Sequence, residues 1–287
     1  MIQAFRLTVT DEQEISVIYQ KPEEVAAPAP VAEGPAAKPI NRRKGREKKA
    51  PPAPKPLIVM LHGFPGGTKD GTKDVFVQLE ARMAKAGYPS VRFDFRGCGE
   101  SECQPVDFCL EYAAEDIDAV VNWAKGEGHK TFVLLGEDVG GAAALMAYDA
   151  TYVEALVLLW PTVVMKETAF RSMYTHEARA AADALDAPYV QYGSYRLGWP
   201  FFNEAYKTDL LPYIERIKTP TLIQHGSKDE IVPVEQAFMV RDAMRVPGEI
   251  AVFEGGDHGI TKPNMRDAMF TNIEYFLTKA LKRREKA

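Results

Sequence analysis

Residues 134–144 read LLGEDVGGAAA, and this stretch guides the interpretation of the rest of the chain. The apolar, strand-forming run 131–135 meets a glycine, two acids and a glycine pair, and then becomes an alanine-rich helix. This order is typical of a nucleophile elbow, a sharp strand-to-helix turn that presents one side chain at the top of a sheet. Glycine suits Gly136 and Gly140 because the strand and helix backbones pass very close there. The presented residue is Asp138, where serine is usual.

Length and composition are those of one globular α/β domain spanning residues 1–287. The chain has a formal net charge of −5, and its 46% of hydrophobic residues can form a large core. Residues 1–6 lack a basic stretch followed by an apolar one, so we expect no signal peptide. The longest apolar runs fall well short of the roughly 18 residues that a membrane span needs. We therefore expect a cytoplasmic protein that does not associate with membranes.

Three cysteines, Cys98, Cys103 and Cys109, are crowded into one loop region. An odd number of cysteines favours reduced thiols over a disulfide framework, in keeping with a cytoplasmic protein. Metal ligation is the alternative, but no fourth Cys or His lies nearby at finger spacing. The sequence therefore predicts neither a metal site nor a cofactor.

Residues 21–56 interrupt the pattern. They contain nine of the 20 prolines. The stretch 38–55 has eight basic residues and one acid, a charge of +7, so the rest of the chain has a net charge of about −12. Such a segment cannot bury enough apolar area to offset its ordering entropy, so we expect a disordered insertion. A solvated spacer is favoured over an arm for nucleic acid or an acidic partner, because no aromatic residues are interleaved for base stacking.

Strands and helices alternate along the remaining chain. The stretches 4–9 and 15–19 predict an antiparallel pair at the start of the sheet. Further strands are expected at 56–61, 90–93, 131–135, 153–159, 221–224 and 250–253, and helices at 74–86, 111–125, 139–148 and 264–281. This alternation predicts a doubly wound, mostly parallel sheet.

Several motifs follow these strands: HGFPGG at 62–67, FDFRGCGES at 93–101, GEDVGG at 136–141, HGSKDEIVP at 225–233 and GGDHG at 255–259. In this order the chain resembles the α/β-hydrolase fold superfamily over nearly its whole length outside the insertion. The sequences of residues 91–97 and 225–233 are most similar to those of feruloyl/cinnamoyl esterases and serine-peptidase-like hydrolases. An aspartate at the elbow is similar instead to epoxide hydrolases and dehalogenases, which also often carry an HG-x-P loop. In those enzymes the residue after the aspartate is usually Trp or another bulky residue, whereas here it is Val139.

The order nucleophile, acid, histidine in this fold assigns the other catalytic candidates. Asp229 follows the strand 221–224, and His258 follows the strand 250–253. Asp229 is expected to accept a hydrogen bond from His258 and to fix its tautomer. Backbone N–H groups of Phe64 and Val139 are expected to stabilise an oxyanion. We interpret Glu230 and Asp257 as turn residues and His62 as part of the loop structure. For the other histidines, His129, His176 and His225, the sequence indicates no partner.

Residues 162–206, after the sixth strand, form an irregular and aromatic segment with one expected helix at 178–185. We interpret this segment as a lid over a moderately apolar substrate. Its tyrosines are possible proton donors to a leaving oxygen, although the sequence selects none of them, and most of its rings are expected to form the lid's own core.

The chemistry of Asp138 determines the predicted reaction. Attack of a carboxylate on a carbonyl would give a reactive anhydride, whereas attack at saturated carbon opens an epoxide or displaces halide and forms an enzyme ester. Water activated by His258 would then cleave this ester. We expect the helix N-terminus to keep Asp138 ionised with a low pKa. The alternative is a serine esterase scaffold in which Asp replaced Ser, naturally or by design, leaving a weak catalyst or a binding protein.

Overall fold

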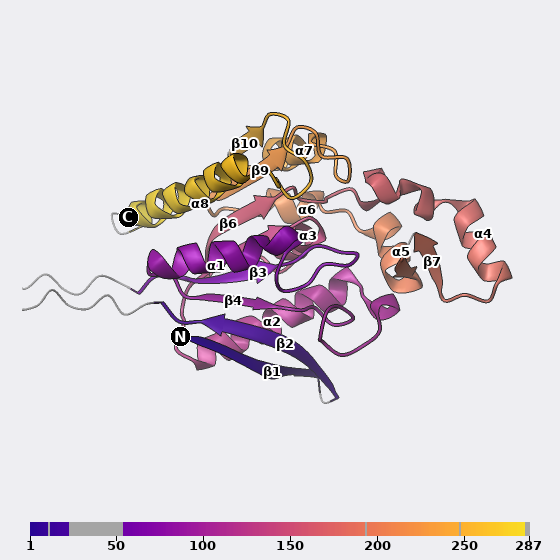
Figure 1. The fold of residues 1–287 in the computed structure, drawn as a ribbon, viewed down its shortest axis with the longest axis horizontal. Helices are drawn as coiled ribbons and strands as arrows, with labels where there is room; N and C mark the ends of the chain where they lie inside the picture. The colour runs from indigo at the N-terminus through magenta and orange to yellow at the C-terminus, as the bar shows by residue number, and fades with distance from the viewer. Residues whose placement is uncertain (11, 23–53, 193, 247, 285–287) are drawn as a thin grey trace, which may run out of the picture.

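The computed structural model describes residues 1–10, 12–22, 54–192, 194–246 and 248–284. Its centre is an eight-stranded sheet in the order β1-β2-β4-β3-β5-β6-β9-β10 (Figure 1). The strands are β1 (Ile2–Thr10), β2 (Gln13–Gln20), β3 (Leu57–Leu61), β4 (Ser90–Phe93), β5 (Phe132–Glu137), β6 (Val153–Leu159), β9 (Thr221–Gly226) and β10 (Glu249–Phe253). β2 pairs antiparallel with β1 and β4, and the other neighbours are parallel. The mostly parallel sheet with an antiparallel start is confirmed.

Helices cover both faces of this sheet, as a doubly wound fold requires. The helices α1 (Val75–Lys85) and α8 (Pro263–Arg284) pack on one face. The other face is covered by α2 (Leu110–Gly126), α3 (Val139–Met146), α6 (Leu211–Glu215) and α7 (Glu235–Ala243). Successive residues of each strand point to opposite faces, so the two cores share each central strand. This explains the uninterrupted hydrophobic sequence LIVML of β3.

The predicted inward faces of the helices are confirmed. Val75, Leu79 and Met83 are fully buried in α1, as expected from their spacing along one helix face. The corresponding positions of α2, Ile117 and Val120, are likewise buried in the core on the other face of the sheet.

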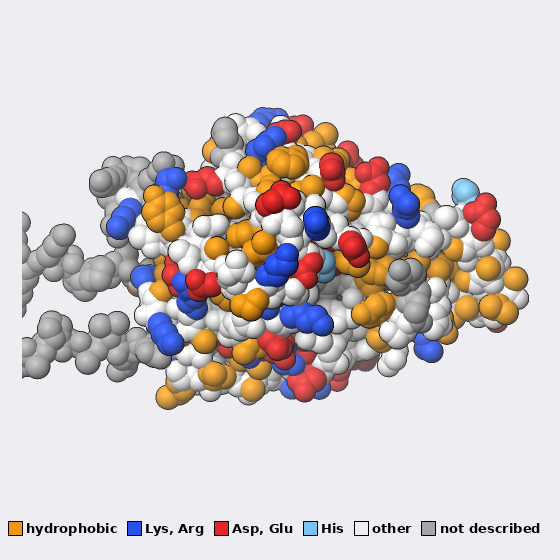
Figure 2. Space-filling model, turned by 45° about the horizontal axis from the view of Figure 1, so that its top comes forward, with side chains coloured by type: hydrophobic (Ala, Val, Ile, Leu, Met, Phe, Trp, Pro, Cys, Tyr) orange, Lys and Arg blue, Asp and Glu red, His pale blue; other side chains and the backbone are white. Residues whose placement is uncertain are grey.

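Between β6 and β9 the chain leaves the main sheet. This part contains the 3-10 helices η3 (Met165–Glu167) and η4 (Ala169–Tyr174), the helices α4 (His176–Ala184) and α5 (Trp199–Lys207), and the hairpin strands β7 (Tyr189–Tyr192) and β8 (Tyr195–Gly198). Figure 1 shows α4, β7 and α5 beyond the carboxyl ends of the parallel strands. In Figure 2, hydrophobic side chains are frequent at this end, whereas charged side chains of both signs are interspersed over the body. The helix predicted at 178–185 corresponds to α4, whereas the sequence predicted neither α5 nor the hairpin.

The predicted insertion at 21–56 lies mainly outside the described residues. At its borders, the Lys21 N–H donates to the Met1 carbonyl, and β3 begins at Leu57. Within the described ranges, no helix is both long and apolar enough to cross a membrane. The same ranges contain no group of three or more His, Cys, Asp and Glu side chains arranged to hold a metal ion.

Candidate active site

Asp138 occupies the sharp turn between β5 and α3. Its backbone has φ 50° and ψ −123°, a conformation that costs a non-glycine residue on the order of 1–3 kcal/mol. The surroundings impose this turn because the chain segments are almost in contact. A Cβ on Gly140 would lie 2.2 Å from the Leu61 carbonyl oxygen, and one on Gly136 would lie 2.4 Å from the Gly140 carbonyl oxygen. The predicted need for glycine at both positions is thus explained by backbone packing.

Hydrogen-bond donors surround the Asp138 carboxylate. The Phe64 N–H donates to Oδ2 at 3.3 Å, and the Thr162 hydroxyl donates to Oδ1. The backbone of Val139 contributes a further hydrogen bond to the carboxylate. The two groups expected to stabilise an oxyanion therefore contact the carboxylate itself. Thr162 was not predicted from the sequence, because its position beside Asp138 depends on how β6 leads into the following segment.

The expectation of a low pKa for Asp138 is wrong. Asp138 is only 7% exposed, and this burial raises its pKa above the ordinary value. Attraction by His258 and the hydrogen bonds from Thr162, Val139 and Phe64 offset the effect only in part. The degree of burial could not be read from the sequence, and it outweighs the favourable field of the α3 N-terminus.

Glu137, the residue before Asp138, points into the protein and is fully buried. Its Oε1 accepts hydrogen bonds from the Thr72 N–H at 2.8 Å and the Thr72 hydroxyl at 3.2 Å, at the start of η1 (Thr72–Asp74). Burial raises its pKa to about 7; the Thr72 N–H opposes this shift, and the nearby Asp138 charge adds to it. The elbow therefore holds two neighbouring carboxyl groups in different environments.

His258 and Asp229 are brought together as predicted. His258 Nδ1 lies 2.9 Å from Asp229 Oδ2 and 3.1 Å from Oδ1. His225, for which the sequence named no partner, also contacts this carboxylate, with Nε2 3.3 Å from Asp229 Oδ2. The same Nε2 lies 2.9 Å from the Val232 carbonyl oxygen, which can only accept, so this nitrogen carries the proton.

These contacts set the charge on Asp229 and His258. Burial alone would raise the pKa of Asp229, but hydrogen bonds from His225, His258 and the Val232 N–H lower it below its usual range. Burial alone would lower the pKa of His258, but the hydrogen bond to Asp229 and the charge of Asp138 outweigh it and raise this pKa. The arrangement orients the imidazole and stabilises its protonated form.

The loop after β3 is held by contacts of His62 and Phe64. Its Nδ1 lies 2.7 Å from the Gly63 carbonyl oxygen, and its Nε2 lies 3.1 Å from the Phe95 nitrogen, where it accepts from the N–H. Burial lowers the pKa of His62, which keeps the ring neutral. The next side chain, Phe64, stacks on Phe108 with ring centroids 4.0 Å apart. These contacts fix the direction of the Phe64 N–H toward Asp138.

Asp138 and His258 line one cavity of about 430 Å³. Phe64 lies in its wall, and Phe170 and Tyr195 reach it from the segment 162–206. Asp229 stands behind His258, with a fully buried side chain. A carboxylate, an oriented imidazole and backbone donors thus converge on a space of the size that small molecules occupy.

Comparisons with known proteins agree with this architecture. The family model described as alpha/beta hydrolase fold matches residues 56–193, and that of the prolyl oligopeptidase family matches residues 158–284. The mitochondrial palmitoyl-protein thioesterase ABHD10 of Mus musculus is 26% identical over 219 residues, covering 71% of this chain and 69% of that protein. The AB hydrolase superfamily protein YisY of Bacillus subtilis is 25% identical over 257 residues, covering 75% of this chain and 91% of that protein.

Solved structures share the fold at low sequence identity. Est1E from Butyrivibrio proteoclasticus, with ferulic acid bound, has a TM-score of 0.72 and 17% identity, covering 97% of this chain and 100% of that one. The mouse alpha/beta hydrolase domain-containing protein 10 has a TM-score of 0.69 and 19% identity, covering 96% of this chain and 99% of that one. With the sheet order, the elbow and the two family models, these similarities confirm the resemblance to the α/β-hydrolase fold superfamily. The chain belongs to the α/β-hydrolase superfamily.

Proposed function

We propose that this chain hydrolyses a small molecule through a covalent enzyme ester, with Asp138 as nucleophile, His258 as general base and Asp229 as the acid that orients His258. The main support is the position of the Asp138 carboxylate. One oxygen accepts from the Phe64 N–H, and the carboxylate shares a cavity with the imidazole paired to Asp229. The substrate class is an epoxide, an alkyl halide or a related ester-type compound.

In the first step Asp138 Oδ1 attacks a saturated carbon of the substrate. The new C–O bond forms as the bond to halide or epoxide oxygen breaks, and the leaving atom takes the electron pair. Thr162 already donates to Oδ1, but a carboxylate oxygen has a second lone-pair site for the substrate. The lid residue Tyr195, which lines the same cavity, is suited to give a proton to an epoxide oxygen.

In the second step His258 takes a proton from water, and the hydroxide attacks the carbonyl carbon of the Asp138 ester. The negative charge then develops on Oδ2, which accepts from the Phe64 N–H, and the Val139 N–H gives the same carboxyl group a second backbone hydrogen bond. Collapse breaks the bond between the Asp138 carboxyl carbon and Oδ1, which leaves with the substrate carbon. The protonated His258 returns its proton to this oxygen, so the alcohol is released. The new carboxyl group, which keeps the oxygen from water, loses its remaining proton to solvent and is a carboxylate again. Asp229 contacts Nδ1 of His258 and orients the imidazole in both its neutral and its protonated form.

A second candidate is an esterase-like scaffold whose serine was replaced by Asp138. It is favoured by the hydrogen bonds that Asp138 accepts at both oxygens and by its raised pKa, which disfavours the ionised nucleophile. The sequence relatives named as thioesterase and lipase also agree with an ester-cleaving ancestor. In that case the protein is a weak catalyst or binds its ligand without turnover.

Isotope labelling separates the two candidates. The protein in excess over an epoxide or haloalkane panel is incubated in heavy-oxygen water, and the peptide containing Asp138 is weighed. The enzyme-ester route places one heavy oxygen in that peptide, because hydroxide attacks the Asp138 carboxyl carbon. Asp138→Asn is expected to be inert toward every substrate that the native protein turns over.

A different pair of results would support the replaced-serine candidate. No turnover of any panel member, together with new activity of Asp138→Ser toward aryl esters, contradicts the aspartate route and supports the replaced serine. Circular dichroism of both variants excludes misfolding as the cause.

A further inference from the structure

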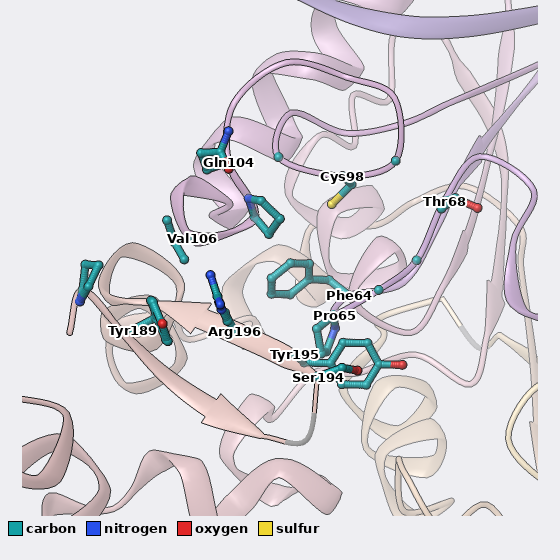
Figure 3. Close-up of a pocket in the computed structure, with 16 residues that line it drawn as sticks. Phe64, Pro65, Thr68, Cys98, Gln104, Val106, Tyr189, Ser194, Tyr195 and Arg196 are labelled. Carbon is teal, nitrogen blue, oxygen red and sulfur yellow. The ribbon is translucent and has the colours of Figure 1, made fainter. Parts of the chain in front are cut away.

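Figure 3 shows a second cavity, of about 620 Å³. It shares part of its lining with the cavity that contains Asp138. Both cavities are lined by residues 64–68 and by Tyr195. The ring of Tyr195 lies directly on Gly66, where a Cβ would be 2.4 Å from its Cε1. Tyr195 therefore forms part of the boundary between the two spaces, and a molecule held in the second cavity lies along the loop that carries the Phe64 N–H.

The wall of the second cavity is mainly apolar or neutral. Phe64, Pro65, Pro105, Val106 and Pro188 contribute hydrophobic surface. Cys98 also lines it, but burial raises the pKa of this thiol, so it stays protonated and uncharged. Such a wall favours an apolar or aromatic part of a ligand, and the volume is within the range of small-molecule sites.

Arg196 is the single charged side chain among the described residues that line this cavity. Its guanidinium lies over the Tyr189 ring, 4.8 Å from the centroid, within the β7–β8 hairpin. In Figure 3 it projects from β8 toward Val106. Within the described part of the chain, no carboxylate forms a salt bridge with it. Stacking on Tyr189 orients the planar guanidinium and leaves its N–H groups for an external acceptor.

The hairpin that carries Arg196 is held against the body of the protein. A Cβ on Gly198, at the end of β8, would lie 1.7 Å from the Val106 carbonyl oxygen in η2 (Pro105–Asp107). This close packing places one end of β8 directly on the opposite wall of the cavity. Arg196 is therefore a positioned group rather than a side chain on a free loop.

We propose that the second cavity binds the distal part of the substrate of Asp138, an apolar group that ends in a carboxylate bound by Arg196. The location of the reaction rests on the function proposed above, whereas the carboxylate preference rests on this cavity alone. Arg196 is exposed, and its guanidinium can bind a carboxylate through two parallel, charge-assisted hydrogen bonds. The substrate class is thus narrowed to amphiphilic acids that carry the reactive carbon some distance from the carboxylate.

Calorimetric titration of the full chain with 4-phenylbutyrate and its neutral analogue 4-phenylbutanamide tests this proposal. The acid is expected to bind about tenfold more tightly than the amide, as for one charge-assisted pair at an exposed arginine. Arg196→Gln should remove this preference by weakening the acid alone, and Arg196→Lys should retain only part of it because the planar fork is lost. Arg171→Gln, an exposed arginine of η4 outside the cavity lining, is the matched control and should bind like the native chain.

A variant that fills the cavity tests the location. Val106→Trp is expected to weaken both ligands, with thermal unfolding used to check that it folds. Equal binding of acid and amide, failure of both to bind, or an unchanged preference in Arg196→Gln overturns the proposal. None of these readouts depends on turnover, so the carboxylate site and the role of Asp138 can fail separately.

Discussion

A carboxylate at position 138 uses the surrounding donors differently from a serine hydroxyl. Asp138 accepts from the Phe64 N–H and the Thr162 hydroxyl before any substrate is bound. The Phe64 N–H is then not free to bind the carbonyl oxygen of an incoming ester, whereas it is already in place for the oxyanion that we propose to form on Asp138 itself. For this reason our proposal is attack on saturated carbon rather than acyl transfer.

The buried Glu137 is expected to make the stability of the folded protein depend on pH. Its pKa is raised from 4.5 to about 7 by burial, so the folded protein holds a proton that the unfolded chain releases. The associated stability is complete below about pH 4.5 and is lost as the pH rises through 7. Between pH 5 and pH 8, the native chain should lose on the order of 2 kcal/mol more unfolding free energy than Glu137→Gln. Urea denaturation at the two pH values measures this difference.

Exposed Glu127, at the end of α2, offers a control for that measurement. Glu127→Gln should show the same pH dependence as the native chain, within about 0.5 kcal/mol. Identical pH dependence of the native chain and Glu137→Gln would mean that Glu137 is ionised in the folded protein at low pH.

At the scale of elements, the segment 162–206 is attached to the body at both ends. Near its start, Gln236 of α7 accepts from the backbone N–H groups of Val163 and Val164 at 2.7 and 2.9 Å. Near its end, the Glu204 carboxylate of α5 accepts from the Leu110 N–H at 2.6 Å, at the N-terminus of α2. The hairpin with Tyr195 and Arg196 lies between these anchors along the chain, so its position over the cavities depends on them.

Glu204→Gln is expected to weaken the second anchor. The change removes the charge that the α2 N-terminus stabilises and leaves an amide with one acceptor for two N–H donors, those of Leu110 and Glu111. We expect a loss of about 1–2 kcal/mol in the unfolding free energy and faster proteolysis within 162–206. Glu167→Gln, an exposed change in the same segment, should do neither. Unchanged stability and proteolysis of Glu204→Gln would show that this contact does not hold α5.

At the scale of the whole molecule, the sheet determines whether the predicted insertion can be removed. Gln20 at the end of β2 and Ile58 in β3 both pair with Ser90 of β4, so these strands are two spacings, or about 10 Å, apart. Residues 21–23 joined to 55–56 can span this distance, since each extended residue covers about 3.3 Å.

Deleting residues 24–54 should therefore leave the fold intact. We expect a thermal midpoint within a few degrees of the native chain and unchanged ligand binding, because the deletion leaves every described contact of the sheet in place. Differential scanning calorimetry and the phenylbutyrate titration measure both. Insolubility, or a large loss of stability or binding, would mean that the segment is more than a spacer.

Much of the candidate site followed from local sequence. The turn at Asp138 requires glycine at Gly136 and Gly140, and the positions of Asp229 and His258 follow from the ends of two hydrophobic strands. Contacts between distant segments were not predictable in this way. Thr162 lies 24 residues from Asp138, and Glu137 meets a threonine 65 residues away.

The sequence by itself determined the order of strands and helices, the elbow and the loops that carry Asp138, Asp229 and His258. These features depend on hydrophobic periodicity and on backbone clearance, which neighbouring residues specify. Only the tertiary structure decided the direction of the Asp138 pKa, the pairing of His225 with Asp229 and the placement of Arg196 in a cavity. The reason is physical: burial and through-space contacts arise when segments far apart in the chain pack together, and the pKa of a carboxyl group follows that packing rather than its neighbours in sequence.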